Sequence, residues 1–429
     1  MTAPLIVIGI TLVVMLLSII FDFRIKIGKV KLGAYWVTCF IGSIICIACG
    51  FISTESLKNV FVSSANINPL KILIIFLSCT SMSVLLDKIG FFRYIAQLAL
   101  KKAKSSQTKL FFVFSFIVVL LTIFTSNDIL ILTFTPFICY FTKRAKIDAT
   151  PYIVSEFVMA NAWSMFFYID NPTNIYLCTN FGITFLEYTA KMFLPTIVAG
   201  GVSLLLVYLL FRKKLKQKIE IEDEEIIKPN FKLISIGLSG LGAMIIMMII
   251  CPYIGLDIWY IPLICAALTY LATLIYLLAT KQKLTIMGNS FKSLPYELVP
   301  FLISMAILVG TLTDIGFINF FANALSGNHF IVIGIFAFLI GNLINNIPMS
   351  MLFTSVLANM PFALNNIYAV VISSNLCAFL TPVGALAGIM FMKILKENEV
   401  KFSFAKFILY GLIISLPTLL LSQCTLLIM

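Results

Sequence analysis

Charged residues are scarce in this sequence of 429 amino acids. Only 11% of the residues are charged and 61% are hydrophobic, whereas a globular chain is about 25% charged and about 45–50% apolar. A soluble globular protein is therefore excluded, and so is a disordered chain, because a sequence with 39 Phe residues cannot remain solvated. We predict an all-α polytopic membrane protein that has lipid as its solvent along most of its length.

Histidine is nearly absent, and cysteine is never paired. The one His is His329, and the ten Cys are spread singly through apolar segments without a CxxC motif, so no metal centre is indicated. The sequence also has no HExxH or Ser/His arrangement and no nucleotide fingerprint. We therefore expect no enzyme activity, no catalytic residues, no bound metal, and no cofactor beyond a coupling ion, H+ or Na+.

What the sequence does contain is a series of apolar segments. Crossing the core of a bilayer takes about 20 apolar residues. Ten segments are predicted to cross it: 4–21, 33–52, 70–86, 151–182, 192–211, 233–251, 258–280, 295–313, 365–393 and 403–428.

The basic residues give these spans an orientation. Arg24, Lys26, Lys29 and Lys31 follow the first span, so they are predicted to stay in the cytoplasm and the N-terminus to lie outside. When the later spans alternate in direction, 27 of the 30 Lys and Arg fall in stretches predicted to be cytoplasmic. Membrane topology thus explains the net charge of +12, and no nucleic-acid partner is indicated.

Two further apolar stretches do not fit this alternation. Residues 110–142 have basic residues at both ends and are interrupted at 125–128, and residues 330–361 are interrupted at 345–348. Broken backbone at membrane depth is tolerated where protein buries it or where it lines a cavity. We predict two re-entrant helical hairpins, the first entering from the cytoplasmic side and the second from the outer side.

Each predicted hairpin precedes a long span that is itself interrupted. The span 151–182 is broken at Asp170–Asn174, and the span 365–393 is broken at Thr381–Gly384. The same order of elements with opposite orientation predicts an inverted-topology repeat, and paired interruptions point to the binding site of a transporter. The predicted organisation is an N-terminal transmembrane helix 1–32, a first repeat 33–211, a cytoplasmic linker 212–232 and a second repeat 233–429.

Four acidic residues lie within these segments. Glu156 and Glu297 are near the cytoplasmic ends of theirs, within reach of water, so a structural or entrance role is expected for them. Asp128 and Asp170 are deeper, where a charge costs about 2.5–3.5 kcal/mol, so they are expected to face the protein interior. Asp128 either takes part in transport or caps the helix that follows the hairpin tip.

The interruptions are rich in amide and hydroxyl side chains and contain no Lys or Arg. Helix N-termini inside the membrane present unpaired N–H groups that can hold an anion or a polar oxygen. The predicted substrate- and ion-binding residues are Thr125, Ser126, Asn127, Asp128, Asp170, Asn171, Thr173, Asn174, Asn345, Asn346, Thr381 and Gly384.

These motifs resemble those of the arsenite/antimonite efflux permeases. That family belongs to the ion transporter superfamily, which also contains sodium-coupled dicarboxylate and citrate carriers. The resemblance covers nearly the whole chain and is sharpest at Ser126-Asn127-Asp128, Asn171 to Asn174, Asn345-Asn346-Ile347-Pro348 and Leu380 to Ala387. The chain departs from the family where those permeases tend to carry further acids, since it has Asn161 and Asn375 there.

The resemblance implies a proton-coupled carrier in the plasma membrane that exports trivalent arsenic or antimony hydroxide. Arsenous acid is neutral at cytoplasmic pH, which suits a site of Asn, Thr and Asp without a cationic clamp. The alternative is a sodium-coupled carboxylate or inorganic-anion permease with the same fold. The expected partners are the lipid bilayer and a small inorganic or organic solute, and a homodimer is a candidate assembly.

Overall fold

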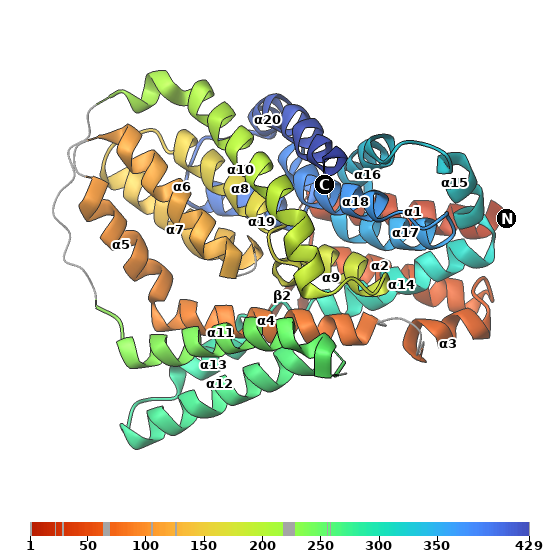
Figure 1. Cartoon of the computed structure of the whole chain (residues 1–429), viewed down its shortest axis with the longest axis horizontal. Coiled ribbons are helices and arrows are strands. Elements are labelled where there is room, and N and C mark those ends of the chain that lie inside the picture. Colours follow the sequence, from red (N-terminus) through yellow and green to blue (C-terminus); the bar gives the residue numbers. More distant parts are fainter. Residues whose placement is uncertain are drawn as a thin grey trace.

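The computed structural model is a bundle built almost wholly of helices (Figure 1). It describes residues 2–21, 23–27, 30–62, 69–103, 106–124, 127–217, 228–254, 256–257 and 259–428. Two halves of the chain, before and after residues 218–227, contain corresponding helices in the same order, and the first half contains a pair of short strands in addition.

The first half runs from a pair of helices through a hairpin and a broken helix to a long final helix. Its elements are α1 (Thr2–Ile20), β1 (Arg24–Ile27), β2 (Val30–Gly33), α2 (Ala34–Ala48), α3 (Thr54–Val62), α4 (Pro69–Ile89), α5 (Phe91–Ala103), α6 (Gln107–Phe124), α7 (Asn127–Arg144), α8 (Thr150–Trp163), the 3-10 turn η1 (Tyr168–Asp170), α9 (Pro172–Asn180) and α10 (Phe185–Leu215).

The second half repeats this order. Its elements are α11 (Phe231–Ile254), α12 (Tyr260–Ala279), α13 (Thr285–Lys292), α14 (Leu298–Asp314), α15 (Phe317–Leu325), α16 (Phe330–Ile344), α17 (Asn346–Ala358), α18 (Leu364–Leu376), η2 (Cys377–Phe379), η3 (Pro382–Gly384), α19 (Leu386–Glu397), α20 (Phe404–Cys424) and η4 (Thr425–Leu427). Counted in this way, α1 corresponds to α11, the pair α6 and α7 to α16 and α17, and α10 to α20.

The two halves are packed crosswise. Helix α2 of the first half packs on α14 of the second, and α12 of the second half packs on α4 of the first. The final helices α10 and α20 pack against each other, and the arm α7 lies against α19 just as α17 lies against α9. The pairs α6–α7 and α16–α17 lie at opposite sides of the bundle (Figure 1).

The outer surface of the bundle is apolar, as a lipid-facing surface must be. Within the described residues, α1, α4, α10, α11, α12 and α20 are each long and apolar enough to cross a membrane. Leucine and isoleucine side chains on α1, α12 and α20 are exposed. In contrast, α4 is mostly buried and has buried hydroxyl side chains at Ser78, Thr80, Ser81 and Ser83. The chain is thus a multi-pass membrane protein.

A pair of strands was not predicted from the sequence, nor were the helices α3, α5, α13 and α15, which lie outside the predicted spans and hairpins. Strands β1 and β2 pair antiparallel, with Arg24 opposite Gly33, in a stretch expected to be a cytoplasmic loop. Alternation of basic and apolar residues at Arg24-Ile25-Lys26-Ile27 has the period of a strand. The strands connect α1 to α2 and place Gly33 beside the start of α14, where its N–H donates to Glu297 Oε1 at 3.1 Å.

Candidate functional site

The helices are interrupted at the four positions where polar residues break the apolar segments. Helix α6 ends at Phe124 and α7 begins at Asn127, while α16 and α17 meet at Asn345. Between α8 and α9 only η1 is regular, and η2 and η3 lie between α18 and α19. The polar side chains at these breaks form the candidate site.

The tip of the second hairpin is bonded to the second broken helix. Asn345 has a φ of 78°, which few residues other than glycine adopt, and its Oδ1 accepts a hydrogen bond from the Ile347 amide at 3.3 Å. Its Nδ2 donates to the Val383 carbonyl at 2.9 Å. Asn346 Nδ2 donates to the Ser374 carbonyl at 3.2 Å. Both asparagines are buried, so this tip is enclosed by protein.

A network of side-chain amides joins the two broken helices. Asn375 Oδ1, near the end of α18, accepts hydrogen bonds from Ser164 Oγ at 2.9 Å and from Asn171 Nδ2 at 3.0 Å. Asn375 Nδ2 donates to Asn174 Oδ1 at 2.7 Å, and Asn174 Nδ2 donates to the Ser164 carbonyl at 2.9 Å. Residues about 200 positions apart in the chain therefore share one buried cluster.

Thr173 extends this amide network to the hydroxyl group of Ser374. Its N–H and its hydroxyl both donate to Asn171 Oδ1, at 3.1 and 3.0 Å, and the hydroxyl is 3.1 Å from Ser374 Oγ. Asn171 is the N-cap of α9, and Pro172 occupies the first helical position, where its missing N–H costs nothing. The predicted residues Asn171, Thr173 and Asn174 thus lie together.

Thr381 and Gly384 occupy the break before α19. The Thr381 hydroxyl donates to Asn342 Oδ1 of α16 at 2.8 Å and accepts a hydrogen bond from the Gly384 amide at 3.2 Å. A Cβ on Gly384 would meet the Cys377 carbonyl group and would lie 3.1 Å from Asn342 Oδ1. Gly384 therefore allows a close approach of backbone, while Thr381 ties the break to the second hairpin.

The described part of the first hairpin tip is bonded to the first broken helix. Asn127 Nδ2 donates to Asn161 Oδ1 of α8 at 2.9 Å, and Asn127 Oδ1 accepts from the Asp128 amide at 2.9 Å. Asn127 is buried, but Asp128 is only partly buried. Thr125 and Ser126, which complete the predicted tip, lie outside the described residues.

A cavity of about 660 Å³ reaches Asp128. Side chains from α1, α2, α4, α7, α14 and α19 line it, among them Trp36, Thr80 and Leu132, and so does Glu297, which directly precedes α14. Arg24, Lys292 and Lys393 also line it, and they lie in stretches predicted to be cytoplasmic. The cavity therefore connects the predicted cytoplasmic end of the bundle with the first hairpin tip.

The four acidic residues within the predicted membrane segments differ in their exposure and in their partners. Asp170 is buried as expected, and its Oδ2 has no hydrogen-bond partner in the described part of the chain. Glu297 lies on the cavity wall and is partly exposed, in agreement with its predicted position. The expectation that Glu156 lies within reach of water is wrong, because it is 1% exposed and its Oε1 accepts a hydrogen bond from Thr135 at 2.8 Å. Helix α8 packs on α6, α7 and α10, which cover this end of it.

Several residues of the site were not among the predicted ones. From the sequence, Asn161 and Asn375 were identified only as positions where the chain departs from the family pattern. In the structure, Asn375 is the centre of the amide network. Ser164, Asn342 and Ser374 went unnoticed, because serine and asparagine within an apolar helix give no periodic signal. The available clue was their position ahead of a predicted break, three residues before it for Asn342 and six and seven residues before it for Ser164 and Ser374.

The hydrogen-bonding groups described above are amides, hydroxyls and backbone carbonyls. Such groups can replace the hydration of a polar uncharged solute or of a small cation. The three basic residues of the cavity are set apart from them, at the predicted cytoplasmic end. The amide and hydroxyl network therefore lies apart from the basic side chains, and Asp128 and Asp170 are the acids at the predicted breaks.

Paired hairpins and paired broken helices, with polar side chains at the breaks inside an apolar bundle, define a membrane transporter. The chain belongs to the family described as CitMHS, Citrate transporter, which matches residues 33–368. A membrane protein of Bacillus subtilis (strain 168) is 26% identical over 408 residues, covering 87% of this chain and 89% of that protein. The "Arsenical pump membrane protein" of Escherichia coli (strain K12) is 24% identical over 379 residues, covering 82% of this chain and 84% of its own length.

Two solved transporters have a similar fold. The YdaH transporter of Alcanivorax borkumensis gives a TM-score of 0.55 at 14% identity, covering 99% of this chain and 97% of its own. MtrF of Neisseria gonorrhoeae, described as one of a class of antimetabolite efflux pumps, gives a TM-score of 0.54 at 15% identity over 100% of this chain and 95% of its own. The family and these relatives place the chain among multi-pass transporters of the plasma membrane.

Proposed function

We propose that this transporter exports a small neutral hydroxylated solute from the cytoplasm, with trivalent arsenic or antimony hydroxide as its substrate. The observation that carries the proposal is the neutral character of the buried network around Asn171, Asn174 and Asn375. Amides and hydroxyls both donate and accept hydrogen bonds, so they can pair with an uncharged solute that carries several O–H groups. The E. coli relative named for arsenicals supports the choice of solute.

The cavity supports the proposed direction of transport, which is export. A cavity that extends from the predicted cytoplasmic end to Asp128 admits a solute from the side on which an exporter must collect it. Closure of this route and opening of the opposite one would then release the solute outside, as in other carriers built from inverted repeats.

Asp128 is the proposed proton carrier. Its carboxyl group lies on the cavity wall at the hairpin tip, and its backbone amide donates to Asn127. In one state the carboxyl group can exchange a proton with the cytoplasmic cavity, and in the other state with the outer side. Proton entry would thereby accompany export of the solute.

One observation favours a second candidate function. Arg24, Lys292 and Lys393 on the cavity would attract an anion, and the family is described as one of citrate transporters. A sodium-coupled carboxylate or inorganic-anion permease would use this basic approach, with Na+ offsetting the charge of its substrate at the neutral site.

Transport in an arsenite-sensitive bacterial host distinguishes the two functions. Expression of the wild-type chain should raise arsenite resistance and lower intracellular arsenic, whereas Asp128→Asn should do neither. Lys281→Gln, an exposed change away from the cavity, is the matched control and should behave as wild type. Unchanged arsenic accumulation with confirmed membrane insertion, together with sodium-dependent uptake of citrate, would move the assignment to the anion permease.

A further inference from the structure

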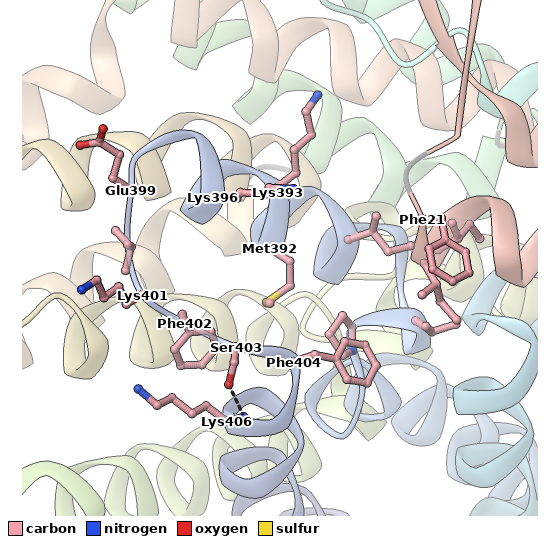
Figure 2. A pocket seen from close by; sticks show the side chains of 16 residues that line it. Phe21, Met392, Lys393, Lys396, Glu399, Lys401, Phe402, Ser403, Phe404 and Lys406 are labelled. Carbon is pink, nitrogen blue, oxygen red and sulfur yellow. Dashed lines mark hydrogen bonds between the residues drawn. The ribbon is translucent and has the colours of Figure 1, made fainter.

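A second cavity, of about 790 Å³, lies where α19 ends and α20 begins (Figure 2). It is bounded by the end of α1, by α19, and by the connection from Glu399 to Ser403. Four lysines line it: Lys393, Lys396, Lys401 and Lys406. In Figure 2, Lys401 and Lys406 lie to the left of the cavity, and Phe21 and Phe404 lie to the right.

Most of the lysines of this cavity have no acidic partner among the described residues. Lys393 is 3.5 Å from Glu397, and Glu399, the one acid among the described lining residues, is bonded to Lys143 of α7 at 2.7 Å. That hydrogen bond lowers the pKa of Glu399. Lys396, Lys401 and Lys406 form no ion pair with any acid in the part of the chain that the structure describes. The N-terminus of α20, capped by Ser403, adds the positive end of a helix dipole.

The opposite wall of the cavity is apolar and open. Ile20 is 51% exposed, Phe21 64% and Phe404 44%. These side chains continue the lipid-facing surfaces of α1 and α20. A water-soluble anion held by the lysines would leave this wall in contact with water, whereas an amphiphile would cover it.

We propose that this cavity binds an anionic phospholipid of the cytoplasmic leaflet. The phosphate of the headgroup is held by Lys396, Lys401 and Lys406, and the acyl chains lie over Ile20, Phe21 and Phe404. The cytoplasmic leaflet is the one that carries anionic lipids, and the charge pattern places this end of the bundle there. The inference is independent of which solute the protein carries.

The bound lipid would adjoin the candidate site. Pro382 and Val383 line the same cavity, and the Val383 carbonyl accepts the hydrogen bond from Asn345 at the second hairpin tip. A lipid in this position supports the break before α19 from outside. Transport in reconstituted vesicles should therefore rise when phosphatidylglycerol is added to phosphatidylcholine.

Lipid binding to the purified full-length protein tests the proposal. The probes are phosphatidylglycerol and phosphatidylcholine, and bound lipid is counted by native mass spectrometry over a range of lipid concentrations. A juxtamembrane lysine contributes about fivefold to the affinity for an anionic lipid, so K396Q/K401Q/K406Q should weaken phosphatidylglycerol binding by about a hundredfold. Binding of phosphatidylcholine should stay unchanged.

The matched control is K232Q/K281Q/K283Q, which removes three exposed lysines from other stretches predicted to be cytoplasmic. It should keep wild-type affinity, and an equal loss in this control would overturn the proposal, since it would show only diffuse attraction. Retention of affinity in the cavity variant would overturn it as well. If the glutamine variant fails to fold, K396A/K401A and K406A, made separately, should each show a partial loss.

A competition measurement distinguishes binding of a lipid from binding of a soluble anion. Glycerol 3-phosphate carries a similar phosphate without acyl chains and should not displace phosphatidylglycerol at equal concentration. Phe404→Gln keeps the lysines but removes part of the apolar wall, so it should weaken phosphatidylglycerol binding. Full competition by glycerol 3-phosphate, with no effect of Phe404→Gln, would mean that the cavity takes a free anion and that the lipid proposal is wrong.

Discussion

Both tips have a buried asparagine bonded to the broken helix of the same half, Asn345 at the tip of α16–α17 and Asn127 at the tip of α6–α7. The next residue differs, because Asn346 is buried and bonded whereas Asp128 lies on the wall of a cavity. The two tips occupy corresponding places in two halves with the same order of elements. Carriers built from inverted repeats open to one side when the halves adopt different arrangements. The difference between the tips therefore identifies the open side as the one that carries Arg24, Lys292 and Lys393.

The largest effect is expected when the carboxyl group at the open tip is replaced, because this group distinguishes the two tips. Asp128→Asn should fold and insert, because an amide has nearly the shape of a protonated carboxyl group, but it should abolish proton-driven flux while leaving exchange of solute across vesicles intact. Reconstituted vesicles with and without a pH gradient give both measurements. Full proton-driven flux in the variant would assign Asp128 to helix capping and direct the search for the coupling site to Asp170 or to Na+.

Removal of an amide from each half should have unequal effects on stability. Asn375→Ala leaves Ser164, Asn171 and Asn174 without a shared partner, and a buried polar group without a partner costs about 1–3 kcal/mol, so a loss of about 3 kcal/mol is expected. Asn127→Ala deprives mainly Asn161 and should cost about 1 kcal/mol. Thermal unfolding in detergent measures both, and equal losses would contradict the contrast between the amide network of the two broken helices and the first hairpin tip.

Chemical labelling should measure the difference in aqueous access between the two tips. Leu132→Cys and Ser350→Cys each lie five residues after the asparagine that leads their tip; Leu132 is 45% exposed on the cavity and Ser350 is 1% exposed. In a background without native cysteines, a membrane-impermeant reagent on the cytoplasmic side should label position 132 about ten times faster, since thiol reactivity requires access.

The same labelling assay tests how the first hairpin sits in the membrane. Lys109→Cys and Lys143→Cys should both react from the cytoplasmic face. Labelling of the two positions from opposite faces would make α6–α7 a full crossing, and both the hairpin and the inverted repeat would then be wrong.

The smallest effect on stability is expected from an ion pair on the side of the bundle away from the cavity. Asp257, in the connection from α11 to α12, pairs with Lys71 of α4 at 3.1 Å. The hydrogen bond from Lys71, together with one from Trp259, lowers the pKa of Asp257. The pair therefore stabilises the fold at pH values above the unfolded pKa of an aspartate, about 3.9, and this contribution is lost as the pH falls through the folded value.

Because this ion pair is exposed, Asp257→Asn should cost less than about 1 kcal/mol at neutral pH. Thermal unfolding at a series of pH values is the measurement, and wild type and variant should converge in acid. A difference that persists below the folded pKa would mean that Asp257 acts through packing.

The sequence was sufficient to predict the spans and the breaks, because both leave local signals. Apolar length, basic flanks and runs such as Asn345-Asn346-Ile347-Pro348 mark where helices cross and where they end. Pairing between distant residues leaves no such signal. The hydrogen bonds of Asn375 to Ser164 and Asn171 depend on how the two broken helices are packed, which one-dimensional periodicity does not contain.

The burial of Glu156 likewise could not be predicted from the sequence. Its position near the predicted cytoplasmic end of a span suggested contact with water, but exposure depends on the neighbouring helices as well as on depth. Helices α6, α7 and α10 surround α8, so Glu156 is buried against Thr135. The sidedness of the hairpins and the boundaries of the two predicted repeats stay predictions that the labelling experiments address.

The crosswise packing of the halves has a consequence for biosynthesis. Helix α4 leaves the ribosome early, but α11, α12, α13 and α14, which pack on it, are synthesised only after residue 230. Until then α4 has only the neighbours from its own half, among them α5, α7 and α9, and the rest of its surface lacks its final partners. The N-terminal half produced alone should therefore be degraded in the cell, and co-expression of residues 228–429 as a separate chain should rescue it.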